Sequence, residues 1–156
     1  VGIYREHMPY LDLPSETRKC LERLLAAGVR LALITDGRHV GQWNKIHALG
    51  LERYFNKERI SVSDDVGYDK NHIEPWLRME SLTPDCDERW YIGDNPRKDF
   101  RFPRSLGWHT VMLADDGRNT KTQHVDLPDE FYAEMTIKSL DSLPDKIFFS
   151  PDATIS

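Results

Sequence analysis

The stretch WYIGDNPRKDF, residues 90–100, decides the fold that this sequence predicts. Its apolar beginning is typical of a buried strand ending at Gly93, and two aspartates follow, Asp94 and Asp99. A buried parallel strand places its next side chain at the carboxyl edge of the sheet, where open α/β folds bind ligands. Two carboxylates there, beside the start of a helix, suit magnesium, which prefers hard oxygen ligands. The alternative is an ordinary strand-to-helix turn in which Asp94 or Asn95 only caps the helix.

Two further segments strengthen the magnesium interpretation. LALITDG, residues 31–37, is another apolar run that ends in a hydroxyl, Thr35, followed by Asp-Gly. GYDKN, residues 67–71, lies between the two predicted strands and is a turn in which Lys70 leads into a predicted helix. The chain therefore carries a strand ending in Thr, then a Lys, then a strand ending in Gly-Asp with a second Asp five residues later.

In this order and at this spacing the three segments resemble motifs two, three and four of the haloacid dehalogenase (HAD) superfamily. The segment KIHALGLERYF, residues 45–55, is also similar to that family, and the resemblance runs from about residue 4 to residue 143. It implies an α/β fold with a doubly wound parallel sheet, a HAD-like Rossmannoid core. It also implies hydrolysis of a phosphate monoester through an aspartyl-phosphate, with magnesium as the cofactor and a small phosphorylated metabolite as the substrate.

The resemblance assigns roles in phosphate binding to motifs two and three. Thr35 would hold phosphoryl oxygens with its hydroxyl, and the neighbouring backbone N–H groups of Asp36 and Gly37 would complete the cradle. Lys70 would bind the phosphate and supply the cation that offsets the clustered negative charge, as phosphoryl transfer requires.

Motif four would hold the metal. The resemblance implies that Asp94 binds magnesium directly, that Asn95 lies in the metal shell, and that Asp99 orients a metal-bound water or Lys70. The expected metal site is therefore Asp94, Asn95 and Asp99, and the expected catalytic residues are Thr35, Lys70 and Asp99. One departure from the family is that its usual Lys-Pro pair is Lys-Asn here, which changes the turn but keeps the charge.

The largest departure is at motif one, which in the family is an apolar strand ending in Asp-x-Asp-x-Thr that supplies the nucleophile and the acid. No such segment precedes Thr35, and the family's helical cap is missing as well. We therefore expect the complete protein to be the phosphatase and this chain by itself to be inactive. On this basis residues 1–14 are a linker remnant after the cap, residues 15–143 are the core, and residues 144–156 are a tail. The alternative is a non-catalytic HAD-fold remnant or interaction domain.

The missing strand is central in this fold, between the strands that carry Thr35 and Asp94. Without it, two buried strand edges would lack hydrogen-bond partners. The gap could be filled by the N-terminal residues 1–8, by the tail 147–155, by closure of the two strands on each other, by a further N-terminal segment, or by a neighbouring chain, as in a homodimer. We expect one of the last two.

The tail contains a degenerate match to motif one, IFFSPDAT, at residues 147–154. Ser150 would stand at the position of the nucleophile and Asp152 at that of the acid. This hypothesis is disfavoured because only about seven residues separate the tail from the preceding strand, whereas a parallel crossover usually needs a dozen or more. A frayed terminus is the simpler expectation.

Hydrophobic periodicity predicts alternating helices and strands, the pattern of a parallel sheet with helices on both faces. The predicted helices cover residues 15–27, 38–49, 71–82 and 98–106. The predicted strands cover residues 29–35, 60–63, 89–92, 110–113 and, at an edge of the sheet, 135–140. Residues 115–130 are polar and rich in Gly, Asp and Asn, which predicts a loop.

Composition excludes several other classes of protein. The 156 residues, 39% of them hydrophobic, indicate one soluble domain with a real core. The net charge of −5, with no basic stripe interleaved with aromatics, argues against a nucleic-acid partner. No apolar run approaches a membrane span and the two cysteines lack metal-ligand spacing, so no membrane contact is expected and the cytoplasm is the expected location. A receiver domain is disfavoured because receivers place their acidic residues before the Thr and the Lys last.

Overall fold

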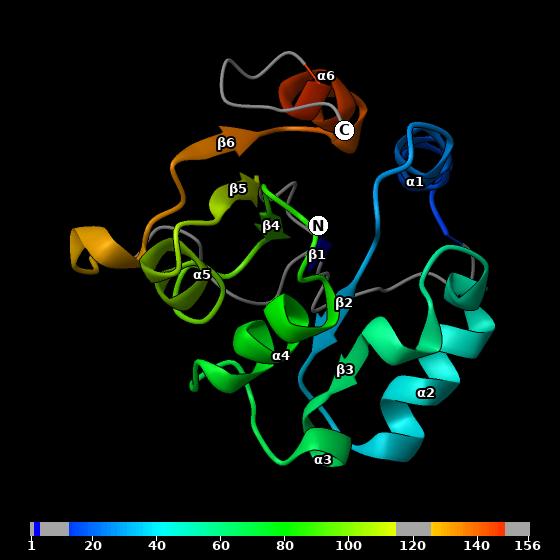
Figure 1. Ribbon diagram of the computed structural model, residues 1–156, viewed down its shortest axis with the longest axis horizontal. Helices are drawn as coiled ribbons and strands as arrows, with labels where there is room; N and C mark the ends of the chain where they lie inside the picture. The colour runs from blue at the N-terminus through cyan, green and yellow to red at the C-terminus, as the bar shows by residue number, and fades with distance from the viewer. Residues whose placement is uncertain (1, 4–12, 115–125, 149–156) are drawn as a thin grey trace.

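The structure is a computed structural model that describes residues 2–3, 13–114 and 126–148 (Figure 1). It is an α/β fold in which all strand pairs among the described residues are parallel, as the sequence predicts. Four strands follow one another in the order β1-β4-β5-β6, with β6 at the edge, and β2 pairs with β3. The strands are β1 (Gly2–Ile3), β2 (Leu33–Thr35), β3 (Ile60–Val62), β4 (Trp90–Gly93), β5 (His109–Leu113) and β6 (Met135–Ile137).

Helices cover both faces of the sheet. They are α1 (Ser15–Ala26), α2 (His39–Ala48), α3 (Ser63–Val66), α4 (Glu74–Leu82), α5 (Arg101–Ser105) and α6 (Leu143–Phe148). β4 divides the core, because successive strand side chains point to opposite faces. Trp90 and Ile92 join the apolar cluster that includes residues of α1, α2 and α6. Tyr91 joins the second cluster, with Trp76 and Met79 of α4.

The strand predicted for residues 29–35 is shorter than expected. The backbone N–H of Val29 donates to the carbonyl of Leu24 (3.0 Å), and Gly28 adopts a φ of 82°. These are the features of a helix C-terminus closed by a left-handed glycine. The first residues of the predicted strand therefore complete the end of α1, and β2 begins only at Leu33.

The helix predicted for residues 71–82 begins at Glu74. The residues before it form a turn in which the Asn71 N–H donates to Asp69 Oδ1 (2.9 Å), and this local bond competes with helix formation. Two leucines, Leu25 and Leu77, are exposed on α1 and α4.

The gap between β4 and β2 is occupied by β1 (Figure 1). Gly2 pairs with Tyr91 and Ile3 with Ile92, so the N-terminal residues supply the partner on that edge of β4. This differs from the expectation that a neighbouring chain or a further N-terminal segment fills the gap. The reason is that even two extended residues satisfy backbone groups of β4 that burial would otherwise leave unpaired.

The beginning of the expected tail is helical. Residues 143–148 form α6, in which Leu143, Pro144 and Ile147 are buried, and Leu143 and Ile147 pack in the cluster of α1. The strand hypothesis for residues 147–154 is therefore wrong at its first two residues, and Ser150 and Asp152 lie outside the described residues. The domain boundaries stay predictions. Of the loop predicted for residues 115–130, residues 115–125 lie outside the described residues, and a short 3-10 helix begins at Asp129. Within the described ranges, no helix combines the length and the hydrophobicity needed to cross a bilayer.

Candidate active site

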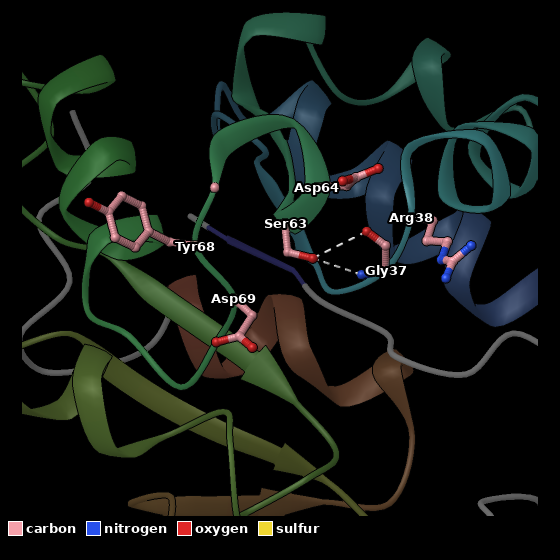
Figure 2. A pocket seen from close by; sticks show the side chains of 7 residues that line it. Gly37, Arg38, Ser63, Asp64, Tyr68 and Asp69 are labelled. Carbon is pink, nitrogen blue, oxygen red and sulfur yellow. Dashed lines mark hydrogen bonds between the residues drawn. The ribbon is translucent and has the colours of Figure 1, made fainter.

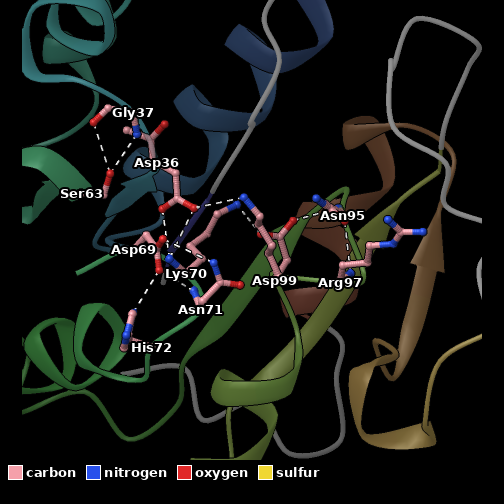
Figure 3. A network of polar contacts seen from close by, with 12 residues as sticks. Asp36, Gly37, Ser63, Asp69, Lys70, Asn71, His72, Asn95, Arg97 and Asp99 are labelled. Atoms are coloured by element: carbon pink, nitrogen blue, oxygen red, sulfur yellow. Dashed lines mark hydrogen bonds and ion pairs between the residues drawn. The ribbon is translucent and has the colours of Figure 1, made fainter.

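Side chains from three separate segments meet beyond the ends of β2 and β4 (Figure 3). Asp36 follows β2, Lys70 lies in the turn before α4, and Asp99 follows β4 by six residues. Lys70 joins the other two, since its backbone N–H donates to Asp36 Oδ1 (3.1 Å) and its Nζ contacts Asp99 Oδ1 (2.5 Å). The structure thus brings together residues 34 and 29 positions apart in the sequence.

Lys70 and Asp99 form a buried ion pair, and both side chains are 0% exposed. Asp99 Oδ2 also accepts the backbone N–H groups of Asp94 (3.1 Å) and Asn95 (2.8 Å). Both oxygens of Asp99 are therefore engaged, one by the lysine and the other by the turn after β4. The turn approaches so closely that a Cβ at Gly93 would lie 2.6 Å from Asp99 Oδ2, which explains the glycine at the end of the strand.

Asp36 has a mixed electrostatic environment. Burial raises the pKa of its carboxyl above the ordinary value, and the charges of Lys70 and Lys98 partly offset that rise. Lys98 Nζ lies 3.8 Å from Asp36 Oδ2 and is half-buried, so it is a second cation at this edge of the sheet. The motif-based prediction used only the backbone of Asp36, whereas the structure also places its side chain among the charged groups.

The predicted phosphate cradle has two neighbours that the sequence did not reveal. The Thr35 hydroxyl donates to Gln42 Oε1 (3.0 Å), and the Gly37 N–H donates to Ser63 Oγ (2.9 Å). Gln42 also covers Gly37, where a Cβ would lie 2.3 Å from Gln42 Nε2. Ser63 directly follows β3. Because the carboxyl ends of parallel strands meet at one edge of a sheet, the sequence could have predicted that Ser63 lies near the cradle. No sequence signal singles out Gln42, one side chain on the exposed beginning of α2.

The residues expected to bind magnesium fit that ion only in part. Asp94 directly follows β4, and Asn95, the next residue, accepts the Arg97 N–H with Oδ1 (3.1 Å), so two residues with side-chain oxygens stand at the strand end. Asp99 does not suit a direct metal ligand, because lysine and backbone N–H groups engage both of its oxygens. Among the described residues, no three His, Cys, Asp or Glu side chains are grouped to hold a metal ion. A site with fewer protein ligands is compatible with magnesium, which often binds one or two carboxylates and completes its coordination with water and phosphate.

A pocket of about 370 Å³ opens beside this cluster (Figure 2). Its lining comes from the ends of β2 and β3 and from the loop before Lys70. The labelled lining residues are Gly37, Arg38, Ser63, Asp64, Tyr68 and Asp69. The pocket is therefore continuous with the predicted phosphate cradle, because Gly37 belongs to both.

The sequence matches known proteins over most of its length. A family model described as "Haloacid dehalogenase-like hydrolase" matches residues 3–113. A glyceraldehyde 3-phosphate phosphatase from Methanocaldococcus jannaschii is 33% identical over 130 residues, which is 83% of this chain and 54% of that protein. The chain spans about half the length of the curated relatives it matches.

Solved structures with the same fold include a HAD phosphatase from Thermococcus onnurineus, with a TM-score of 0.67 and 23% identity over 91% of this chain and 60% of that one. A second is the HAD-hydrolase YfnB from Bacillus subtilis bound to magnesium, with a TM-score of 0.67 and 21% identity over 85% of this chain and 55% of that one. At these identities the similarity shows the fold alone.

Proposed function

Because the chain belongs to the haloacid dehalogenase-like hydrolase family, we propose that it is the core of a magnesium-dependent phosphatase acting on a small phosphorylated metabolite. The observation that carries the proposal is the buried Lys70–Asp99 pair beside Thr35 and Asp36. Desolvation makes a buried ion pair no more stabilising than apolar packing in most cases, so a functional role is a reason for a protein to keep one. The phosphatase name of the Methanocaldococcus jannaschii relative supports the same reaction. The cytoplasmic location belongs to this proposal as well.

The phosphate would be held at the end of β2. The Thr35 hydroxyl and the backbone N–H groups of Asp36 and Gly37 would donate to its oxygens, in place of the bonds that Thr35 and Gly37 make to Gln42 and Ser63. Lys70, whose ammonium group contacts Asp99 Oδ1, would add a positive charge at this edge of the sheet. Donors fixed in advance stabilise the charge of phosphoryl transfer without reorganising during the reaction.

Magnesium would be held by Asp94 with Asn95. When bound there, it would offset the negative charge of the phosphate. Asp99 is proposed to position Lys70 and the turn after β4, which is the second of the two roles that the family resemblance allowed it. This assignment follows from its fully engaged oxygens.

The proposed reaction needs an attacking carboxylate, which motif one supplies in the family. In the proposed reaction a carboxylate attacks phosphorus, the bond to the leaving oxygen breaks, and that oxygen takes a proton from an acid. Water then cleaves the aspartyl-phosphate and releases phosphate. Because no Asp-x-Asp-x-Thr segment precedes Thr35, the complete reaction is proposed for a protein in which that motif accompanies this chain.

Phosphate binding to the 156-residue chain tests the proposed site directly. Titration calorimetry with inorganic phosphate and magnesium should detect binding, and Thr35→Val should weaken it by about tenfold, the effect of one lost charge-assisted hydrogen bond. The matched control is Thr136→Val, the same change at an exposed threonine of β6. Equal affinities in the two variants, or no binding by the unmodified chain, would contradict the proposed phosphate site.

A further inference from the structure

Lys98 places a second lysine ammonium group beside the end of β2. Its backbone N–H donates to the Asn95 carbonyl (3.1 Å), so the turn after β4 fixes where the side chain begins. Its Nζ lies 3.8 Å from Asp36 Oδ2, and the backbone N–H of Asp36 belongs to the proposed phosphate cradle. The three sequence motifs assign no role to this lysine.

Lys98 and Lys70 differ in their exposure to solvent. The side chain of Lys70 is 0% exposed, whereas that of Lys98 is 29% exposed. An anion that arrives from solvent therefore meets the Lys98 side chain before it meets Lys70. A lysine carries its compact charge on a flexible stem of four carbons, so the ammonium group can move to follow a ligand.

The charge of Lys70 is already compensated closely. Its Nζ contacts Asp99 Oδ1 (2.5 Å) in a pair that is neutral as a whole. A phosphate monoester carries about two negative charges at neutral pH. Binding it gains more from a cation whose charge is less closely matched, and of the two lysines that cation is Lys98.

The contact between Lys98 and Asp36 is loose. Hydrogen bonds between a charged N–H group and a carboxylate usually measure about 2.7–2.9 Å, whereas these two groups are 3.8 Å apart. Asp36 is engaged more closely by Lys70, whose backbone N–H donates to Asp36 Oδ1 (3.1 Å), as Figure 3 shows. A bound phosphate, with its larger negative charge, would therefore compete well with Asp36 for the Lys98 ammonium group.

We propose that Lys98 is a phosphate-binding residue, whose ammonium group leaves Asp36 and pairs with an oxygen of the bound phosphate. This inference rests on the proposed function, because the phosphate must be held at Thr35 and Gly37 for Lys98 to meet it. Asp36 is then a positioning residue, which keeps Lys98 at the end of β2 until the ligand arrives.

The first test is titration calorimetry of the 156-residue chain with inorganic phosphate and magnesium. Lys98→Met should weaken binding by about tenfold, the effect of one lost charge-assisted interaction. Lys98→Arg should keep most of the affinity, because a guanidinium group also pairs with phosphate.

The matched control is Lys138→Met, the same change at an exposed lysine that directly follows β6, two strands from β4. Neighbouring strands lie about 4.8 Å apart, and salt at about 0.1 M screens exposed charges over about 10 Å. This variant should therefore change the affinity by less than about twofold.

A second test separates direct binding from neutralisation of Asp36. Asp36→Asn keeps an oxygen for the Lys70 N–H and removes the competing carboxylate. It should tighten phosphate binding by about twofold to fivefold, the usual range for one partly exposed ion pair. Adding Lys98→Met to this variant should again weaken binding by about tenfold, because the phosphate itself is the partner that Lys98 loses.

Each outcome decides a different claim. If the unmodified chain does not bind inorganic phosphate, or if Thr35→Val has no effect, the proposed function fails and this inference fails with it. If Thr35→Val weakens binding but Lys98→Met does not, only the inference is overturned. An equal loss in Lys138→Met would reflect net charge alone, and a loss that disappears beside Asp36→Asn would mean that Lys98 only neutralises Asp36. Either result overturns the inference. A loss that persists beside Asp36→Asn and is largely restored by Lys98→Arg supports it.

Discussion

Lys70 and Asp99 are each buried completely, so each depends on the other for compensation of its charge. Lys70→Met should lower the free energy of unfolding by about 3–5 kcal/mol, because it leaves the Asp99 carboxylate buried without its cation. The double variant Lys70→Met/Asp99→Asn should recover much of this loss, since the amide oxygen can still accept the N–H groups after β4. Urea unfolding of the single and double variants measures both effects. If the single and the double variant lost the same free energy of unfolding, Lys70 and Asp99 would not be energetically coupled.

The carboxyl of Asp36 gives the site a dependence on pH. Burial raises its pKa in the folded state, so between the unfolded and folded pKa values the folded state binds more protons. Stability from this group therefore falls as pH rises through that window. Asp36→Asn removes the titrating carboxyl but keeps an oxygen that can accept the Lys70 N–H. The variant should gain stability relative to the unmodified chain as pH rises and should lose that advantage in acid.

Thermal unfolding from about pH 3 to pH 8 measures this difference, because the window lies above the ordinary aspartate value. Asp64→Asn, the same change at an exposed carboxyl of α3, is the control. If the stability advantage of Asp36→Asn over the unmodified chain grew as the pH fell, the pKa of Asp36 would not be raised in the folded state.

Gln42 should influence anion binding through the Thr35 hydroxyl that it contacts. Gln42→Glu would place a carboxylate beside the phosphate cradle and should weaken inorganic phosphate binding by about tenfold or more, the effect of about 1.4 kcal/mol. Lowering the pH protonates the glutamate and should restore part of the affinity. Gln42→Met, which is neutral and similar in length, serves as the comparison and should lose less. The same loss in both variants at every pH would show that charge at this position has no effect.

At the scale of elements, α6 shows how a short amphipathic segment completes the core. Ile147 is 7% exposed and packs in the cluster of α1, whereas its neighbour Lys146 is exposed. Ile147→Ala should therefore lower the free energy of unfolding by about 2–4 kcal/mol, the usual cost of truncating a buried aliphatic side chain. Lys146→Ala should change it little. Similar stabilities for the two variants in urea would indicate that α6 does not pack as described.

The elements also show which predictions could be made locally. Strand ends carrying Thr35 and Gly93 were recognised because apolar runs stop at residues with distinctive backbone or side-chain chemistry. The start of β2 was predicted too early. The Val29 N–H donates to a carbonyl at the C-terminus of α1, and hydrophobic periodicity does not distinguish a residue that closes a helix from one that begins a strand. The start of α4 was predicted too early because Asp69 holds the turn before it.

At the scale of the whole molecule, the proposed chemistry requires a nucleophile that motifs two to four do not contain. We expect the 156-residue chain to show negligible hydrolysis of p-nitrophenyl phosphate with magnesium, because holding a phosphate does not supply an attacking carboxylate. A spectrophotometric assay measures this, with a HAD phosphatase of known activity as the positive control. Robust turnover that disappears in Asp94→Asn would show that another group attacks, and Ser150 and Asp152 would be the next positions to change.

The sequence by itself determined the parallel α/β fold, the family, and the order of the segments that carry Thr35, Lys70 and Asp94. It could do so because apolar periodicity is local, and because the ends of parallel strands meet at one edge whatever the details of packing. The roles of these residues stay predictions.

Only the tertiary structure decided which partner each side chain has. It engages both oxygens of Asp99 with Lys70 and the turn after β4, places Gln42 and Ser63 against the predicted cradle, and pairs residues 2–3 with β4. The physical reason is that hydrogen bonds and ion pairs join residues far apart in the sequence. Their partners are therefore set by the packing of whole elements, which spacing along the chain does not encode.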